Sequence, residues 1–358
     1  VKNITMDQLK AIYDGSLTNW KQLGGADEKI VVVSRDTSSG TYEIWHEKVM
    51  RKADVRSDAL LQASNGAIIT TVAGNGSSGN PIPGSVATAT PLVPRGIAVA
   101  ADGTLYVVHS HQVFRVDTSG TLHLFAGTGS TTYNGDGIPA ITATLQSPRD
   151  VALGPDGSVY IPDRLHHRIR RVGTDGIIST IAGTGVNGEY EDGELATSAQ
   201  IGEPWGVAVG ADGTVYIADI TNFVVSKVTP DGIIDTVAGV VGEIGYDGDG
   251  FPATAAHLAE PLGVAVDRDG TVYIMDSFNF AIRRVSSDGI ISTVAGTGDF
   301  GSSNDGVPAT AARLGSVEKV AVDGDGSLLF GDSFSYRIRR VRSPLSQTTV
   351  VPSADGLL

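Results

Sequence analysis

Residues 261–298 read PLGVAVDRDGTVYIMDSFNFAIRRVSSDGIISTVAGTG, and this stretch decides the fold. Four short apolar runs lie within it, at residues 263–266, 271–275, 280–285 and 290–295. The pairs Asp269-Gly270 and Asp288-Gly289 follow the first and third runs. Tight hairpin turns need positive φ angles, which glycine adopts at little cost, so an Asp-Gly pair between two such runs is a strong hairpin signal. The stretch therefore predicts a four-stranded antiparallel meander.

The same unit recurs along the chain with a nearly constant period. Its first strand begins at Pro94, Pro148, Pro204 and Pro261, and in a weakened form at Val317. These starts are 54 to 57 residues apart, and the third-strand sequence I-R-R-V recurs at Ile169, Ile282 and Ile338. No long stretch with a 3.6-residue apolar period interrupts the units, which argues against a helical solenoid. A fixed period with four strands in each repeat predicts the blades of a β-propeller.

The repeated sequence also resembles a known family. The pattern P-x-G-V-A-V-x-x-x-G-x-V-Y-I-x-D, followed by I-R-R-V-x-x-D-G-I-I-x-T-V-A-G-T-G, resembles the NHL repeat of bacterial β-propellers over roughly residues 68–351. The linkers at residues 135–140, 247–253 and 305–309 resemble the G-D-G-x-P-A that joins such repeats. The resemblance implies a mainly β fold, a propeller of four-stranded blades. We count five blades; because NHL-type rings usually have six, an incomplete six-bladed ring is the alternative.

Composition and charge exclude several classes of protein. The chain has 358 residues, of which 41% are hydrophobic and 18% charged, as expected of a globular protein. Its formal net charge of −14 argues against a nucleic-acid partner, because such proteins present a broad basic face. It contains no cysteine, so no disulfide, thiolate metal site or cysteine nucleophile is expected. No apolar run reaches the ~18 residues of a membrane span, so none is expected.

The first 67 residues do not follow the repeat. Residues 6–14 have apolar side chains at helical spacing, residues 29–34 (KIVVVS) are typical of a buried strand, and residues 41–52 of a second helix. The turn RDTSSG lies between that strand and the second helix, at residues 35–40. Such an arrangement is a recurrent anion site, because unpaired backbone N–H groups at the helix start point at the ligand. The segment therefore predicts a small α/β element.

This N-terminal segment resembles the phosphate-binding protein of ABC-type phosphate transporters. The resemblance rests on MDQLKAIYDGSLTNW at residues 6–20, IVVVSRDTSSGT at 30–41 and ALLQASNGAI at 59–68. It implies that Arg35, Ser39, Gly40 and Thr41 bind phosphate. The family binds phosphate between two lobes, and this segment covers only part of one, so we expect at most half of a site. The plain alternative is that Ser39 and Thr41 cap the helix.

We therefore expect two parts in the chain. Residues 1–67 form a partial segment of the phosphate-binding-protein type, and residues 68–358 form the NHL-type propeller. The join lies near residues 65–74, where no Pro- or Ser-rich linker intervenes. The two resemblances imply a location outside the cytoplasm, periplasmic or secreted, although no signal peptide is recognisable at Val1.

Acidic residues that recur at one repeat position are candidates for a cation-binding site. Asp163, Asp219, Asp276 and Asp332 follow the second strand of four units, and Asn222 and Asn279 come three positions after two of them. Carboxylate and amide oxygens are the ligands that a divalent cation such as calcium prefers. The alternative is that each aspartate bonds the backbone of its own turn, and recurrence in nearly every blade favours it. We expect no cofactor, with calcium as the alternative.

The residues that depart from the repeat define a candidate ligand pocket. At the start of the first strand the units carry Arg95, Arg149-Asp150, Trp205, Leu262 and Glu318-Lys319. The first two units also contain His109, His111, His166 and His167. The first-strand starts lie around the channel mouth of a propeller, so we predict a ligand pocket from Arg95, His109, His111, Arg149, His166, His167 and Trp205. The alternative is surface variation without function.

Three functions follow from these features. The favoured one is a non-catalytic, extracytoplasmic binding or scaffold propeller for a protein, a glycan or a small anionic ligand. The second is a propeller enzyme, a lyase or hydrolase, with its site at the channel mouth. The third is phosphate binding by the N-terminal segment. The sequence shows no Ser/His/Asp arrangement and no zinc spacing, so no catalytic residue is assigned.

One prediction concerns ring closure. The IITTVA sequence at residues 68–73 matches a fourth strand, whereas residues 343–351 lack the Asp-Gly turn and contain Pro344. We expect residues 68–73 to form the outer strand of the blade at residues 320–341. Deleting residues 1–74 should then speed hydrogen exchange in that blade specifically. Unchanged exchange there would contradict this closure.

A second prediction concerns phosphate. Because Arg35 and Ser39–Thr41 offer only one wall of a site, calorimetric titration should show phosphate binding that is weak or absent. Micromolar affinity corresponds to ~8 kcal/mol and needs an enclosed anion with several hydrogen bonds. A micromolar or tighter constant would overturn this expectation.

Overall fold

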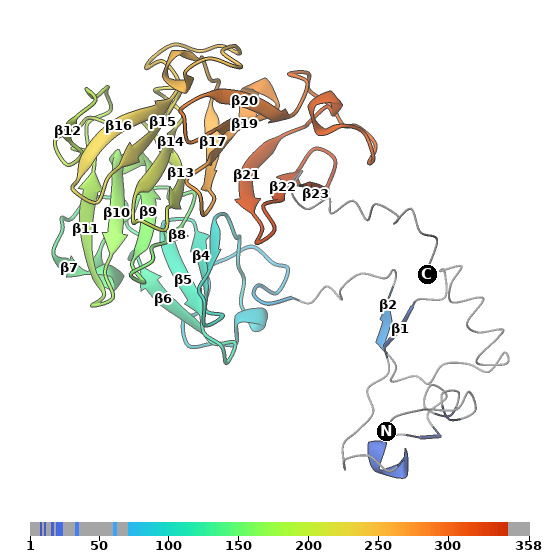
Figure 1. Cartoon of the computed structure of the whole chain (residues 1–358). Helices are drawn as coiled ribbons and strands as arrows, with labels where there is room; N and C mark the ends of the chain where they lie inside the picture. Colours follow the sequence, from blue (N-terminus) through green and yellow to red (C-terminus); the bar gives the residue numbers. More distant parts are fainter. Residues whose placement is uncertain are drawn as a thin grey trace, which may run out of the picture. The chain divides into compact units, whose positions relative to one another are not determined.

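The structure is a computed structural model of the chain, which divides into two units, Val1–Thr71 and Val72–Leu358 (Figure 1). It describes residues 71–342 without a gap and, before them, residues 8, 11, 16, 17, 19–23, 33–35 and 60–62.

In the first unit two short strands pair in parallel. β1 (Val33–Arg35) and β2 (Leu60–Gln62) are in register with Val33 opposite Leu60, and the 3-10 helix η1 (Trp20–Leu23) precedes them. β1 overlaps the strand expected at residues 29–34, and parallel pairing is typical of α/β sheets.

The expected phosphate site falls mostly outside the described part of this unit. Arg35 is the last residue of β1, whereas Ser39, Gly40, Thr41 and the helix expected at residues 41–52 lie outside the described residues. Phosphate binding by these four residues therefore stays a prediction.

In the second unit, residues 72–342 form five antiparallel sheets arranged as propeller blades (Figure 1). Blade 1 contains β3 (Ile97–Val99), β4 (Leu105–His109), β5 (Gln112–Val116) and β6 (Leu122–Ala126). Blade 2 contains β7 (Ile138–Pro139), β8 (Ala152–Leu153), β9 (Val159–Asp163), β10 (Arg168–Val172) and β11 (Ile177–Ala182). Blade 3 contains β12 (Glu194–Leu195), β13 (Pro204–Val209), β14 (Val215–Asp219), β15 (Val224–Val228) and β16 (Ile233–Ala238).

The last two blades follow the same order. Blade 4 contains β17 (Pro261–Val266), β18 (Val272–Asp276), β19 (Ala281–Val285) and β20 (Ile291–Ala295), and blade 5 contains β21 (Val317–Val322), β22 (Leu328–Asp332) and β23 (Arg337–Val341). The short 3-10 helices are η2 (Ala87–Ala89), η3 (Ala140–Thr142), η4 (Arg164–His166), η5 (Ala253–Ala255), η6 (Ser277–Asn279) and η7 (Ala309–Ala311). The predicted mainly β propeller is confirmed, with five blades.

The Asp-Gly pairs turn the chain as predicted. Gly270 has φ +81° and its N–H donates to the carbonyl of Asp267, while Gly289 has φ +80° and donates to the carbonyl of Ser286. A residue with a Cβ atom is strained at these angles, which explains why glycine recurs there. Each hairpin thus fixes the register of its strands, as between β17 and β18, where Val264 lies opposite Ile274.

Apolar side chains fill the space between neighbouring blades. Between blades 3 and 4, Ile274 and Ile291 are fully buried and pack in one cluster with Ala218 and Val225. The linker that joins the two blades adds Leu258, also fully buried. Burial of each such aliphatic side chain stabilises the fold by about 1.5–3 kcal/mol.

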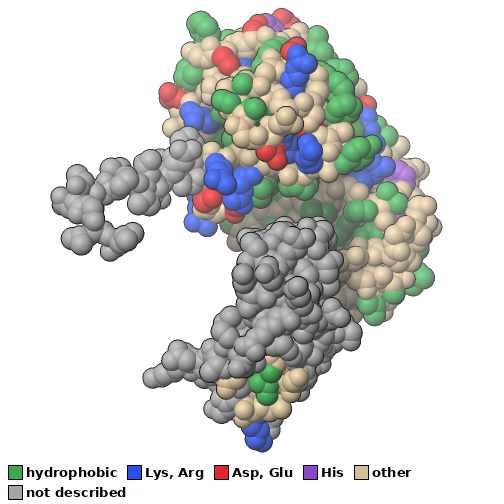
Figure 2. Space-filling model, turned by 90° about the vertical axis from the view of Figure 1, so that its right-hand side faces the viewer, with side chains coloured by type: hydrophobic (Ala, Val, Ile, Leu, Met, Phe, Trp, Pro, Cys, Tyr) green, Lys and Arg blue, Asp and Glu red, His purple; other side chains and the backbone are tan. Residues whose placement is uncertain are grey.

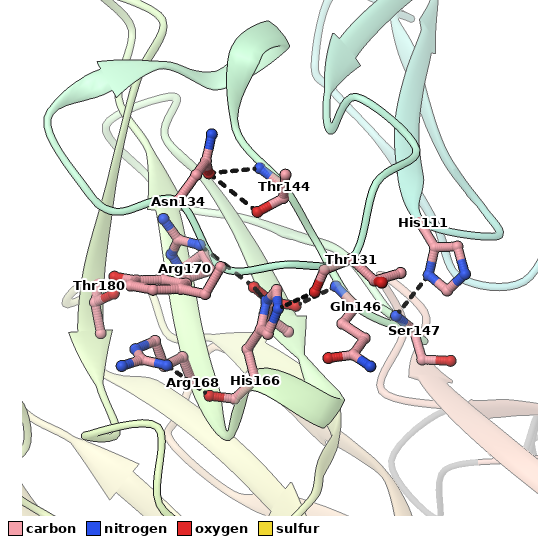
Figure 3. A network of polar contacts seen from close by, with 12 residues as sticks. His111, Thr131, Asn134, Thr144, Gln146, Ser147, His166, Arg168, Arg170 and Thr180 are labelled. Atoms are coloured by element: carbon pink, nitrogen blue, oxygen red, sulfur yellow. Dashed lines mark hydrogen bonds and ion pairs between the residues drawn. The ribbon is translucent and has the colours of Figure 1, made fainter.

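Two arginines lie in the core of the propeller, each held by aspartates. The Arg283 guanidinium donates to Asp276 Oδ2 (3.2 Å) and to Asp249 Oδ1 (2.8 Å), and also to the carbonyl of Asp247 (2.7 Å). Arg170 makes the same contacts with Asp163, Asp136 and the carbonyl of Gly135. Figure 3 shows the Arg170 network. Each arginine therefore joins the middle of its blade to the linker that enters it.

Blade 5 differs from the others at its outer edge. The described part of the chain gives this sheet three strands in the order β21-β22-β23, without a fourth. The segment expected to close the ring lies partly outside the described residues, at 68–70, and its described residues 71–73 are in no strand. Closure by residues 68–73 therefore stays a prediction.

The buried arginine leads to a stability prediction. Replacing Arg283 by Met should lower the free energy of unfolding by about 3–5 kcal/mol, because it leaves the Asp276 carboxylate buried without its cation. Burial already raises the pKa of Asp276 to about 6 even with Arg283 present. The matched control is Arg284→Met, since Arg284 is the next residue on β19 and is exposed.

Urea denaturation measures both variants. The control should change the free energy of unfolding by less than about 0.5 kcal/mol. Equal losses in the two variants would show that the buried ion pair does not hold the blade together.

Candidate functional site

The starts of the five innermost strands meet at one pocket. Its volume is about 190 Å³, and we call it the channel-mouth pocket; it is lined by Pro94, Arg95, Gly96, Arg149, Asp150, Trp205, Leu262, Glu318 and Lys319. The lining comes from all five blades, because each contributes residues at the start of its innermost strand (β13, β17 and β21) or just before it (β3 and β8).

Close backbone packing brings these strand starts together. A Cβ atom on Gly206 would lie 2.5 Å from the carbonyl oxygen of Leu262, and one on Gly263 would lie 2.6 Å from that of Glu318. Neighbouring first strands are therefore in backbone contact at their glycines, which only a residue without a side chain permits. The residue before each glycine, Trp205 or Leu262, lines the pocket.

Positive charge is concentrated on one side of the pocket. The guanidinium carbon of Arg149 lies 4.6 Å from the ring centre of Trp205, and that of Arg164, at the start of η4, lies 4.8 Å from it. Arg164 is ion-paired with Glu203, whereas Arg95 and Arg149 form no ion pair with a described residue. Burial lowers the pKa of Arg149, and the charges of Arg95 and Arg164 lower it further against the opposing effect of Glu318.

Arg149 also has an unused hydrogen-bond donor. Its Nε atom is buried and has no acceptor within the part of the chain that the structure describes. Buried donors are normally paired, because an unpaired one costs about 1–3 kcal/mol. The residue that carries this donor lines the channel-mouth pocket.

A lysine holds three blades together on the other side of the pocket. Lys319 is ion-paired with Asp150, and its Nζ donates to the carbonyl of Ile97 (3.2 Å). Asp150 is buried and accepts from the backbone N–H of Val151 (2.8 Å) and of Val207 (3.3 Å). Blades 1, 2, 3 and 5 thus share one polar network beside the channel-mouth pocket.

The first two predicted histidines lie in the scaffold. His109 is buried, and its Nδ1 accepts from the backbone N–H of Val93 (3.1 Å). Burial lowers the pKa of His109, and the charge of Arg95 adds to that effect. His111 Nδ1 accepts from the backbone N–H of Ser147 (3.1 Å), as Figure 3 shows. Each of these two rings therefore accepts a hydrogen bond from the backbone of a linker and holds that linker in place.

The other two histidines also bond the scaffold. His166 is buried with Nδ1 2.8 Å from Asp163 Oδ2 and Nε2 2.7 Å from the carbonyl oxygen of Thr131 (Figure 3). His167 Nδ1 is 2.7 Å from the carbonyl oxygen of Gly202. The structure thus brings Arg95, Arg149 and Trp205 into one pocket and places the four histidines outside its lining.

Four residues that line the pocket were not among those predicted for it from the sequence. Leu262 and Glu318 line the pocket at the same repeat position as Arg95 and Trp205, and Asp150 and Lys319 line it at the next position, where the other three units have glycine. These two shared positions were the signal that could have placed all four residues in the pocket. Arg164 is not a lining residue of the pocket; its guanidinium stacks on the ring of Trp205, which is one.

The repeated aspartates bond the scaffold. Asp163, Asp276 and Asp332 are fully buried, and Asp219 is 1% exposed. Asp276 Oδ1 accepts from the backbone N–H of Ala259 (2.7 Å), in the linker before β17. Within the described residues no three His, Cys, Asp or Glu side chains are grouped so that they could hold a metal ion. Asp163 and Asp219 likewise accept from linker N–H groups, those of Gln146 and Gly202, whereas Asp332 accepts from the N–H of Ser335 in its own turn.

Comparisons with known proteins find similarities for both parts of the chain. A family model described as PBP superfamily domain matches residues 1–90, and one described as Teneurin NHL domain matches residues 240–305. Teneurin-m of Drosophila melanogaster is 27% identical over 343 residues, which cover 87% of this chain and 12% of that protein. The phosphate-binding protein PstS of Borreliella burgdorferi is 38% identical over 76 residues, which cover 19% of this chain and 27% of that protein.

These matches confirm the two resemblances drawn from the sequence, to NHL-repeat propellers and to phosphate-binding proteins. The chain spans only a small part of either relative's length. A solved structure from Bacteroides thetaiotaomicron aligns with a TM-score of 0.50 at 17% identity, covering 69% of this chain and 60% of that one, and shows the fold alone. Of the helices within the described ranges, none is long and apolar enough to cross a membrane.

Proposed function

We propose that this chain is a non-catalytic binding propeller that takes a small carboxylate-bearing anion at its channel-mouth pocket. The observation that carries the proposal is the Arg149 side chain: its Nε donor is buried without an acceptor among the described residues, and the charges of Arg95 and Arg164 lower its pKa. An entering carboxylate would satisfy that donor and relieve the repulsion among the three arginines.

The charges of the pocket favour an anion of limited size. Lys319 and Arg164 are each neutralised by a carboxylate. The charges left at the pocket are therefore the two positive ones of Arg95 and Arg149 and the negative one of Glu318. Trp205 adds a flat apolar surface, and the volume of about 190 Å³ suits the acidic group of a larger ligand. Such a group occurs on an acidic glycan, on a protein side chain or on a free organic acid.

The two other functions stay as alternatives. A lyase or hydrolase needs a general base at the pocket, and the four histidines predicted as pocket residues are all hydrogen-bonded to the scaffold. Phosphate binding by the N-terminal segment depends on residues beyond the described ranges. The binding function therefore has the stronger support.

The setting we propose is outside the cytoplasm, periplasmic or secreted. The support is the similarity to Teneurin-m and to the phosphate-binding protein PstS. With an overall charge of −14, a local positive pocket would also attract an anion selectively.

The test is titration calorimetry with glucuronate, acetate and phosphate as probes. Arg149→Ala should weaken carboxylate binding at least about tenfold, the loss expected for one charge-assisted hydrogen bond. Its melting temperature should stay within about 2 °C of the parent, because the substitution also removes repulsion from Arg95 and Arg164.

The matched control is Arg115→Ala. Arg115 is an exposed arginine of blade 1 on β5 and does not line the pocket. Binding that is absent in the parent, or equally weakened by both substitutions, would refute the pocket as an anion site.

A further inference from the structure

Each of the five blades places one side chain around the channel-mouth pocket, at a single repeat position. In chain order these side chains are Arg95, Arg149, Trp205, Leu262 and Glu318. Chain order is also the order around the pocket, because the first strands of consecutive blades lie in contact: β3 with β8, β8 with β13, β13 with β17 and β17 with β21. Lys319 of blade 5 donates to the carbonyl of Ile97 in blade 1, so these two blades are neighbours as well.

This order divides the pocket into three sectors. The cationic sector consists of Arg95 and Arg149, from adjacent blades, and the apolar sector consists of Trp205 and Leu262, from the next two blades. The acidic sector is Glu318 of blade 5, between the apolar sector and blade 1. The cationic and acidic sectors are therefore neighbours, and the apolar sector adjoins both of them.

The charged side chains of these sectors form no ion pair in the described part of the propeller. This holds for Arg95, Arg149 and Glu318, whereas Lys319 beside them is ion-paired. Figure 2 shows one side of the propeller, where acidic and basic side chains lie next to each other. Burial lowers the pKa of Arg149, and the negative charge of Glu318 acts in the opposite direction. The carboxylate of Glu318 is thus close enough to influence a charge at Arg149.

A simple anion does not complement all three sectors. It would bond to the arginines, but it would also meet the like charge of Glu318 in the neighbouring blade, which weakens its binding. A zwitterion avoids this repulsion, because its ammonium group is attracted to that carboxylate. An α-amino acid carries both charged groups on one carbon atom, as two neighbouring sectors require. Its side chain then faces the apolar sector.

The size and the apolar part of the pocket also suit such a ligand. The volume of about 190 Å³ lies below the about 300–1,000 Å³ of sites for drug-sized molecules. Trp205 and Leu262 are half-buried, so part of each side chain is available to an apolar group. Covering that surface with an aliphatic side chain adds to binding.

We propose that the channel-mouth pocket binds a free α-amino acid with an aliphatic side chain. Arg95 and Arg149 bind its carboxylate, and Glu318 binds its ammonium group. Its side chain lies against Trp205 and Leu262. This inference rests on the proposed function, because the anion of that proposal becomes the carboxylate of a zwitterion, and it makes Glu318 the residue that selects an amino acid over a plain carboxylate.

Titration calorimetry of the full chain with two matched probes tests the inference. Leucine and isocaproate have the same carbon skeleton and carboxylate, and only leucine carries an ammonium group. Leucine should bind at least about tenfold more tightly, because it gains a charge-assisted hydrogen bond to Glu318 where isocaproate meets only a like charge.

The variant Glu318→Gln should move the two affinities in opposite directions. Leucine binding should weaken about tenfold, because the ammonium group loses its ion pair, whereas isocaproate binding should tighten about twofold to fivefold, because the opposing charge is gone. The matched control is Glu191→Gln, which removes the same charge from an exposed linker residue outside the pocket. The control should leave both affinities unchanged, which separates a direct contact from an effect of net charge.

The outcomes distinguish this inference from the proposed function. If neither probe binds the parent, both are wrong. If isocaproate binds and leucine binds no more tightly, the amino-acid assignment is wrong while the anion site stands. A change of the same sign for both probes in Glu318→Gln would also overturn the assignment, because Glu318 would then act by holding the arginines and not by contacting the ammonium group.

Discussion

A buried aspartate at the end of the second strand is the contact on which the propeller depends. In blades 2, 3 and 4 it accepts the backbone N–H of Gln146 (2.6 Å), Gly202 (2.7 Å) or Ala259 (2.7 Å) from the linker that enters the same blade. Burial makes this carboxylate costly unless its oxygens are bonded, so linker and strand must stay in place together. Because the linker leads directly into the first strand, the same contact sets which side chain lines the channel-mouth pocket.

The blades differ in the side chain that lies beside this buried carboxylate. Blades 2 and 4 use a buried arginine, whereas blade 3 has Ser226 at that position, and Asp219 forms no ion pair with another described residue. There Tyr190 fills the space, with its hydroxyl 2.5 Å from Ser226 Oγ, and burial raises the pKa of Tyr190 to about 12. Burial likewise raises the pKa of Asp219. Blade 1 has His109 and Phe114 in place of the aspartate and the arginine. The same backbone arrangement therefore accommodates an aspartate–arginine pair, an aspartate beside a serine and tyrosine, or a histidine beside a phenylalanine.

Two positive surfaces interrupt an acidic protein, and they arise differently. At the channel mouth Arg95, Arg149 and Arg164 converge because first strands are in backbone contact and η4 packs on Trp205. At β23 the arginines belong to the repeat itself, and Arg340 is exposed just as its counterpart Arg284 is on β19 of four-stranded blade 4. The first surface therefore arises from the convergence of several blades, whereas the second arises from the alternation of side chains along one strand.

The sequence by itself determined the fold, because the Asp-Gly turns, the alternation of apolar residues and the constant period are local features that dictate strands and hairpins. It also predicted Arg95, Arg149 and Trp205 as pocket residues, since one repeat position maps onto one place in a ring. Only the tertiary structure showed that the four predicted histidines bond the scaffold and do not line the pocket: His109, His111, His166 and His167. Their hydrogen-bond partners are backbone groups of linkers distant in sequence. The tertiary structure also showed that Asp163 faces Arg170 in the interior. It showed that Ile338 is exposed whereas Ile282 is buried. The sequence pattern around these two isoleucines is the same, and burial depends instead on which described strands lie beside each of them.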